Sequence, residues 1–192
     1  MNQSEVKWIA GFTSADGTVE PMIKKQSDVS IGYNLSLRIQ WSQEPIIAGF
    51  FNGDGCILPN IRRRGRGFKI NPYLEFDNGD SLVLDELSKM LINLNIKHKI
   101  YNDKRDKVKQ IRVQKFEMVE KLLNFITPFL VGSKRIQAEI MLQEIIPRMK
   151  RGEHRNKIGF LEIMKYIDKL NKLKGGIRGK YNRNFFIEAW NM

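Results

Sequence analysis

The sequence has a single cysteine and very little histidine. Cys56 is alone among 192 residues, so no internal disulfide can form, and a reducing compartment fits the chain. Cys56 also lacks an evident activating partner, which argues against a thiol enzyme. The two histidines, His98 and His154, lie far apart without the spacing of metal ligands, so a histidine-based metal centre is disfavoured.

Long apolar runs are absent as well. No stretch approaches the roughly 20 consecutive apolar residues that a membrane-spanning helix needs. The first seven residues, MNQSEVK, lack the apolar core of a secretion signal. The sequence therefore predicts a protein of the cytoplasm, or of an organelle if the gene is organellar, with no membrane partner.

Acidic residues are outnumbered by basic ones. Lys and Arg total 33 against 21 Asp and Glu, which gives a formal net charge of +12 and an isoelectric point near 9.8. A chain this basic is better suited to a polyanion than to a neutral partner. The hydrophobic content of 42% is ordinary for a globular core.

Two segments of the chain repeat each other. Residues 8–17 read WIAGFTSADG and residues 46–55 read IIAGFFNGDG, so both pass from apolar residues through Ala-Gly-Phe to Asp-Gly. Each segment is typical of a short helix closed by a glycine cap. Small residues recur four positions apart, as at Gly49 and Gly53, and therefore share one helix face. Such a face lets backbones approach closely, which predicts that the two helices pack together.

This packing would bring Asp16 and Asp54 together at the C-terminal ends of the two helices. Helix C-termini carry partial negative charge and two carboxylates repel, so the pair is unfavourable without a cation between them. A hard divalent ion with oxygen ligands, most simply Mg²⁺, meets this need and is a common means of hydrolysing phosphodiesters. For either copy alone, an ordinary Asp-Gly turn is the alternative; the matched flanks of the two copies favour the metal site.

Strand-like segments follow each copy. Residues 18–25 and the alternating stretch 33–43 follow the first copy. Residues 57–62 and 68–77 follow the second, joined by a basic turn at 63–67. The second copy then continues with a helix at 81–94, strands at 97–101 and 109–114, and helices at 116–127, 134–150 and 154–173.

The organisation is therefore a short first repeat (1–43), a full second repeat (44–173) and a basic C-terminal tail (174–192), whose glycine-rich start at 174–181 we expect to be mobile. No linker separates the repeats, so we expect one compact domain.

The two helices and the order of the elements after them resemble the LAGLIDADG family of homing endonucleases over nearly the whole chain. The resemblance implies an α+β fold in which antiparallel sheets form a saddle on the DNA major groove. The two signature helices pack at a pseudo-two-fold seam, with further helices outside. It also implies sequence-specific, metal-dependent cleavage of both strands of a double-stranded DNA target of roughly 15–22 base pairs, about two helical turns, leaving short 3′ overhangs.

The resemblance also assigns roles to single residues. Metal ligation falls to Asp16, Asp54 and the backbone carbonyls of Ala15 and Gly53, with Mg²⁺ as the ion, Mn²⁺ as a substitute and Ca²⁺ binding without cleavage. Gln43 and Asn78, at strand ends, lie near the attacking water, and Lys134 lies near the scissile phosphate. The alternatives are a strand-end hydrogen-bonding role for the two amides and a plain surface role for the lysine.

The exposed strand faces would read the bases, because Arg, Lys, Asn, Gln and Glu pair with distinct base edges. In the first repeat these residues are Glu20, Met22, Lys24, Asn34, Ser36, Arg38 and Gln40; in the second they are Asn60, Arg62, Lys69, Asn71, Tyr73 and Glu75. The basic turns are better suited to phosphates, through Arg63, Arg64, Arg66, Lys104, Arg105, Lys107 and the basic residues of the tail.

The spacing of the two motifs departs from the family. Asp16 and Asp54 are only 38 residues apart, because the first repeat lacks a second pair of strands and its outer helices. A lopsided monomer is favoured, and a homodimer that completes the missing surface is the alternative. An intron-RNA-binding maturase and a non-catalytic DNA-binding regulator are the alternative functions; retention of both acids favours cleavage.

Overall fold

The computed structural model describes residues 17–25, 33–41, 43–65, 67–102, 109–175 and 180–191. The chain divides into two compact units, residues 1–46 and residues 47–192. Several predicted site residues lie outside the described residues, namely Ala15, Asp16, Arg66, Lys104, Arg105 and Lys107. That the two repeats form one compact domain remains a prediction.

The first unit contains an antiparallel hairpin. Strand β1 (Gly17–Lys25) pairs with β2 (Tyr33–Trp41) in a register that runs from Gly17 opposite Trp41 to Lys25 opposite Tyr33. Both strands were expected from the sequence and are confirmed. Pro21 is tolerated within β1 because this sheet has only two strands, so its missing N–H can face away from the partner.

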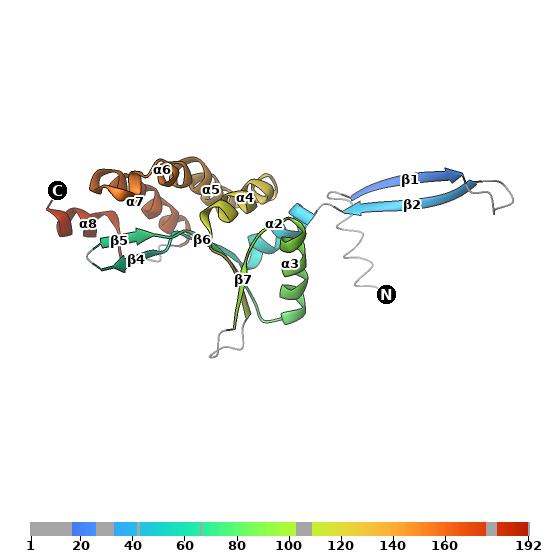
Figure 1. The fold of residues 1–192 in the computed structure, drawn as a ribbon, viewed down its shortest axis with the longest axis horizontal. Helices are drawn as coiled ribbons and strands as arrows, with labels where there is room; N and C mark the ends of the chain where they lie inside the picture. Colours follow the sequence, from blue (N-terminus) through green and yellow to red (C-terminus); the bar gives the residue numbers. More distant parts are fainter. Residues whose placement is uncertain are drawn as a thin grey trace. The chain divides into compact units, whose positions relative to one another are not determined.

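The second unit is built on a four-stranded antiparallel sheet in the order β3-β6-β8-β7 (Figure 1). Its strands are β3 (Gly55–Leu58), β6 (Tyr73–Asn78), β7 (Lys99–Asn102) and β8 (Lys109–Val113). Apolar and polar residues alternate along these strands, so one face of the sheet is buried. The residues of that face are fully buried: Ile57, Leu74, Phe76, Ile111 and Val113.

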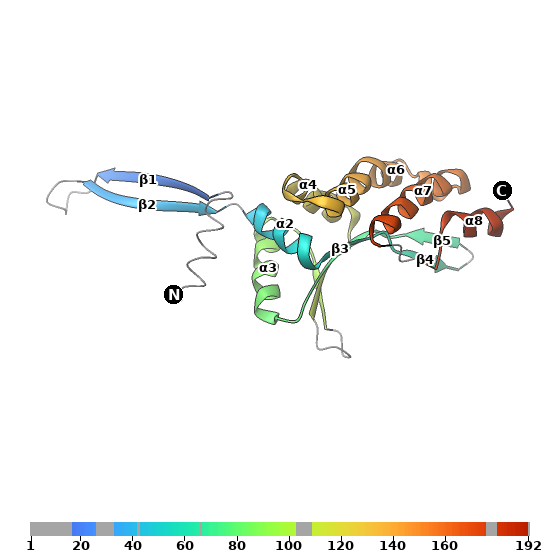
Figure 2. The same cartoon turned by 180° about the vertical axis from the view of Figure 1, so that it is seen from behind.

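Helices pack around the strands of this unit. They are α2 (Gln43–Asp54), α3 (Ser81–Asn93), α4 (Phe116–Ile126), α5 (Gly132–Ile140), α6 (Ile146–Lys150), α7 (Lys157–Leu173) and α8 (Arg183–Trp190). Helices α3 and α4 contact β6, and α4 to α7 lie side by side in one layer (Figures 1 and 2). No helix in the described part of the chain is both long enough and apolar enough to cross a bilayer.

The hairpin after α2 is broken in two, which corrects the expectation of two continuous strands at 57–62 and 68–77. Beyond β3 the chain forms a separate strand β4 (Ile61–Arg64), and before β6 it forms β5 (Gly67–Ile70). The breaks fall at Pro59 and Pro72, which have no N–H to donate to a ladder. One hydrogen bond of 2.8 Å from the N–H of Asn71 to the carbonyl of Asn60 still spans the break.

The C-terminal segment also differs from expectation. The sequence predicts a basic tail at 174–192 and no helix in it, but Arg183–Trp190 form α8, whose Phe186 is fully buried. Asn182 caps this helix by accepting a 2.8 Å hydrogen bond from the N–H of Phe185. The helix was missed because its aromatic residues are stabilised by an apolar surface from other parts of the chain.

Helix α2 passes into β3 at Gly55 without a loop. The expected left-handed glycine cap is absent, since Gly55 does not adopt a positive φ. Its role is steric: a Cβ at this position would lie 2.3 Å from Cδ2 of Phe51 and 2.6 Å from the carbonyl oxygen of Phe51.

We expect Gly55→Ala to lower the free energy of unfolding by about 1–3 kcal/mol, because the fully buried Phe51 has no room to move away. Gly79→Ala is the matched control, since a Cβ there meets no atom within 4 Å, and we expect a change within about 0.5 kcal/mol. Chemical denaturation of the two variants makes the comparison. Equal unfolding midpoints would contradict the steric role of Gly55.

Candidate active site and nucleic-acid interface

Asp54 is the last residue of α2, and its side chain is exposed. No basic residue stands in the last turn of the helix to offset the partial negative charge of the C-terminus. The carboxylate therefore sits where the local field favours a bound cation.

Asn78, at the end of β6, holds this carboxylate. Its Nδ2 donates a 3.0 Å hydrogen bond to Oδ2 of Asp54, and its Oδ1 accepts a 2.8 Å hydrogen bond from the backbone N–H of Asp80. Because the N–H of Asp80 can only donate, the amide of Asn78 has one consistent orientation, with its NH₂ group toward Asp54. Asp80 in turn caps α3 through a 2.9 Å hydrogen bond from the N–H of Leu82, so the arrangement is anchored on two elements.

Lys134 approaches the same helix end from the first turn of α5. Its ammonium group donates to the carbonyl of Gly55, and its Nζ lies 5.5 Å from the centre of the Phe51 ring. The preceding loop is tied down by a 3.3 Å hydrogen bond from the N–H of Val131 to Oδ1 of Asn52. The fold thus places Asn78 on Asp54 and Lys134 on the next residue, Gly55, although these residues are far apart in the sequence.

Gln43 is separate from this cluster in the described chain. It is the first residue of α2, whereas Asp54 is the last, so it is not the strand-end residue that the sequence suggested. Its Oε1 is buried and has no hydrogen-bond partner among the described residues.

The donor set around Asp54 fits a hard divalent cation in part. A carboxylate and a neighbouring carbonyl, that of Gly53, are the oxygen ligands such ions prefer. The described residues contain no group of three or more His, Cys, Asp or Glu that could hold a metal by itself. A cation at Asp54 would therefore need further oxygens from elsewhere, such as a second acid or a phosphate.

The exposed face of the four-stranded sheet carries an ordered polar cluster centred on Arg112. The guanidinium donates to Glu75 and, at 2.7 Å, to Oε1 of Gln110, and it stacks 5.5 Å from the ring centre of Tyr73 and 4.8 Å from that of Tyr101. Sequence reasoning found Tyr73 and Glu75 but missed the other three residues. The alternation of Gln110 and Arg112 with buried Ile111 and Val113 was the available signal.

Two acids of this face have perturbed pKa values. Burial raises the pKa of Glu75, and the neighbouring Asp77 raises it further, while Arg112 opposes both effects. Burial also raises the pKa of Asp77; Arg112 and a hydrogen bond from Gln110 oppose that shift, and Asp54 adds to it. One oxygen of Asp77, Oδ1, is buried and has no hydrogen-bond partner among the residues that the structure describes.

The β4–β5 hairpin presents a row of cations. Arg62, Arg64 and Lys69 are exposed, and Arg62 lies directly opposite Lys69 in the register. Like charges directly opposite each other destabilise a hairpin, and none of the three forms an ion pair within the described part of the chain. A polyanion would relieve this repulsion.

Three further predicted residues lie near this row. Arg63 is exposed across from Phe68, and Asn60 and Asn71 lie at the break between the two sheets.

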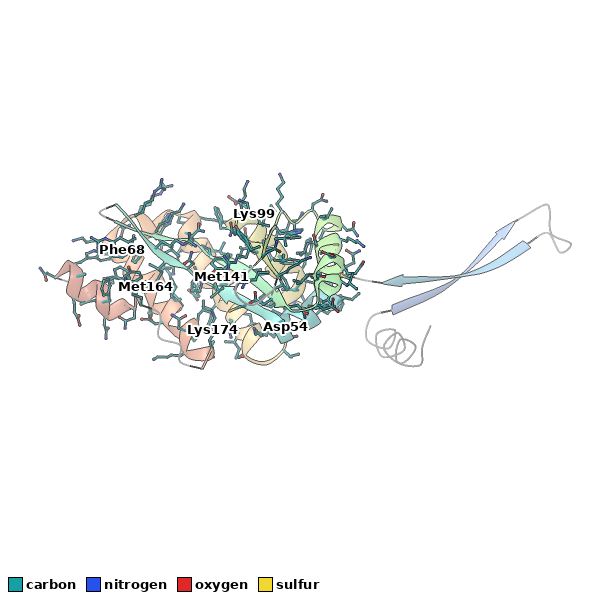
Figure 3. All side chains as sticks on the ribbon, turned by 90° about the horizontal axis from the view of Figure 1, so that it is seen from below. Asp54, Phe68, Lys99, Met141, Met164 and Lys174 are labelled. Atoms are coloured by element: carbon teal, nitrogen blue, oxygen red, sulfur yellow. The ribbon has the colours of Figure 1, made fainter. Side chains whose placement is uncertain are left out.

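A cavity of about 410 Å³ opens beside β3. The described part of its wall includes Cys56, Asn60, Asn171, Lys174, Lys180 and Tyr181 and has no acidic residue. Lys174 donates to the carbonyl of Ile57, and burial lowers the pKa of its ammonium group. The labelled side chains in Figure 3 place Lys174 and Asp54 along the same edge of this unit.

The predicted reading residues of the first unit occupy paired positions of its hairpin. Glu20 lies opposite Arg38, Met22 opposite Ser36, and Lys24 opposite Asn34, and Gln40 lies opposite Thr18. Their assignment to DNA remains a prediction.

Comparison with known proteins agrees with this architecture. A family model described as LAGLIDADG endonuclease matches residues 47–145, just over half of the chain. The chain therefore belongs to the LAGLIDADG endonuclease family. No curated protein gives a significant match.

Solved structures of homing endonucleases share the fold. I-CvuI is 21% identical with a TM-score of 0.67, and the match covers 78% of this chain and 92% of that one. I-TnaI is 20% identical with a TM-score of 0.57, covering 69% and 95%. The archaeal intron-encoded I-Vdi141I is 22% identical with a TM-score of 0.52, covering 98% and 99%. The α+β fold expected from the sequence is confirmed.

We expect Asp77→Asn to raise the melting temperature at pH 7. Because folding raises the pKa of Asp77, the folded protein holds this proton more tightly than the unfolded chain. Stability is therefore lost as the pH rises from the ordinary carboxyl range through the raised pKa. The gain from Asn should shrink to nothing when both states are protonated, below the ordinary value of 3.8. Thermal melts across this range measure it; an equal gain at pH 3 and pH 7 would contradict the electrostatic cause.

Proposed function

We propose that this protein is a sequence-specific endonuclease that hydrolyses both strands of a double-stranded DNA target with the help of divalent cations. The cluster of Asp54, Asn78 and Lys134 at the end of α2 carries the proposal. It joins a metal-ligating carboxylate, an amide that orients this carboxylate and a cation suited to a phosphate, in front of a polar sheet face.

Each residue of the cluster has a distinct proposed task. A bound Mg²⁺ or Mn²⁺ would supply an activated water and would neutralise charge on the leaving oxygen. Asp54 and the carbonyl of Gly53 would hold the ion, while Asn78 keeps the carboxylate in one orientation through its hydrogen bond. Lys134, with ammonium protons beyond the one given to Gly55, would steady the scissile phosphate.

The second half of the site is proposed to use Asp16 with the carbonyl of Ala15. The repeated motif supports this assignment. Gly49 and Gly53 leave one face of α2 open in the second unit, since a Cβ at either position would meet no described atom within 4 Å. We propose that a second signature helix covers this face, from the first repeat in a monomer or, alternatively, from a second copy.

The relatives support the choice of partner and ion. I-CvuI was crystallised with DNA targets in the presence of magnesium, with the DNA not cleaved, and in the presence of calcium. I-Vdi141I was crystallised in complex with DNA. For this chain we propose the same class of partner, with short 3′ overhangs as the product and Ca²⁺ as an ion that binds without supporting cleavage.

The direct test uses the DNA that flanks the gene, because an endonuclease that homes inserts its gene into the site that it cuts. The two flanks are joined in a plasmid and incubated with the purified protein in Mg²⁺ or in EDTA. Linear product in Mg²⁺ alone supports the proposal. Retarded but uncut DNA points to a regulator, and binding of the intron RNA without the DNA points to a maturase.

We expect Asp54→Asn to abolish cleavage of both strands while DNA affinity stays within about tenfold, since the carboxylate serves the cation and only a minority of contacts depend on it. Asp85→Asn, an exposed acid on α3, is the matched control and should cleave like the wild type. Nicking and binding assays on one target measure both effects. Loss of DNA binding by Asp54→Asn would make this residue structural instead.

We expect Arg64→Ala to weaken binding about evenly across target variants and to reduce the slope of log affinity against log salt by about one, as for one lost phosphate contact. The reason is its exposed position on the unpaired cationic row of β4 and β5. Lys89→Ala, on α3 and paired with Glu86, is the control that should leave the slope unchanged. Identical slopes for Arg64→Ala and wild type would remove this hairpin from the phosphate contacts.

A further inference from the structure

The β4–β5 hairpin stands outside the four-stranded sheet and needs support from elsewhere. It is a sheet of two strands with four residues each, and an isolated hairpin of this size is marginal in water. Its register puts Ile61, Phe68 and Ile70 on one face and Arg62, Arg64 and Lys69 on the other. The cationic face can be held in a fixed direction only if the apolar face is seated on something rigid.

An aromatic cluster from the C-terminal segment provides that seat. The ring of Phe68 meets three rings edge-on, with centroid distances of 4.8 Å to Phe186, 5.2 Å to Tyr181 and 6.1 Å to Phe185. Each such pair adds favourable energy beyond the burial of its area. Phe68 is thus enclosed by residues of the C-terminal segment, for which the sequence predicted no helix.

The cluster is itself fixed to the core of the second unit. Phe186 is fully buried and packs 4.9 Å from Phe160 of α7, and Trp190 packs 5.4 Å from the same ring. At the other end of α8, the N–H of Arg183 donates a 3.0 Å hydrogen bond to Asp168 of α7. Helix α8 therefore links the hairpin to α7, the longest described helix of the unit.

The hairpin also lies far from the proposed cleavage site. Figure 3 shows Phe68 and Asp54 toward opposite ends of the second unit. A DNA duplex with its scissile phosphate near Asp54 would meet the hairpin only at the outer part of the half-site. Changes in the aromatic cluster can thus alter recognition without touching the chemistry.

We infer that α8 and Tyr181 are positioning elements for DNA recognition: they fix the direction of the β4–β5 hairpin and so set specificity at the outer base pairs of the target. This inference rests on the proposed function. Its physical basis is preorganisation, because a hairpin held rigidly before binding loses less freedom when its cations meet the DNA. Residues that touch no DNA would then contribute to specificity.

The test uses Phe185→Ala in the full-length protein. Phe185 is 37% exposed, so its loss weakens the cluster without opening the core. Phe129→Ala is the matched control, a ring of 38% exposure outside the cluster. Phe185→Tyr keeps the ring and should restore wild-type behaviour.

Hydrogen exchange without DNA is the first readout. In Phe185→Ala we expect the amides of residues 61–70 to exchange up to about tenfold faster, while β3, β6 and β8 keep their protection. The second readout is the binding profile over all single base-pair changes of the target. We expect it to flatten at the outer positions only, with the single-turnover cleavage rate at saturating DNA unchanged.

Each outcome decides the inference. Unchanged exchange in residues 61–70 overturns the role of α8 as a support. Faster exchange with an unaltered base-pair profile overturns the role in recognition while the proposed endonuclease stands. A wild-type protein that neither binds nor cuts DNA overturns the proposed function itself, and the recognition role falls with it. A profile flattened equally by Phe129→Ala would show a general loss of stability and would also overturn the inference.

Discussion

The junction between α2 and β3 is the constraint on which the site depends. The helix turns into the central sheet with no intervening loop, and this is feasible only because Gly55 leaves room for the ring and carbonyl of Phe51. Asp54 is therefore fixed at the point where a helix end, a strand start and the end of β6 converge. The contact of Lys134 with the carbonyl of Gly55 uses the same junction, so a steric requirement in the core determines the geometry of the polar cluster.

The repeated motif and the resemblance that it carries were sufficient to predict the fold class; the site residues that the resemblance assigns remain predictions. Period-two alternation and the repeated motif predict the strands and α2, whereas Asn78 and Lys134 were assigned by the resemblance to the family and not by these patterns. Gln43 was placed less well, because the sequence does not show where a strand ends and the next helix begins. The breaks at Pro59 and Pro72 were not predicted, although the sequence contains the signal for them, since proline cannot donate a hydrogen bond to a central strand ladder.

Other features depend on contacts between distant segments and could not be derived in this way. The cluster around Arg112 requires the register that puts Glu75 opposite Arg112, and a strand pattern shows a face without showing its neighbours. The C-terminal segment was predicted to be a basic tail because of its lysines, arginines and glycines. Its aromatic ring at Phe186 packs on Phe68 of β5 and Phe160 of α7, and these partners come together only in the folded chain.

The acids of the sheet face help to decide what kind of DNA binding the protein is built for. A surface that only holds phosphates gains nothing from Glu75 and Asp77, whose burial is unfavourable enough to raise their pKa values. Carboxylates accept hydrogen bonds from cytosine, and a guanidinium held by Glu75, Gln110 and two rings presents its remaining donors in a fixed direction. Acids beside the arginine on one face lower the affinity for the phosphate backbone of DNA. They also weaken binding to bases that cannot pair with these charges. This arrangement fits the proposal that the sheet face, with Arg62 and Lys69 of the hairpin, reads bases, whereas Arg64 holds the phosphate backbone.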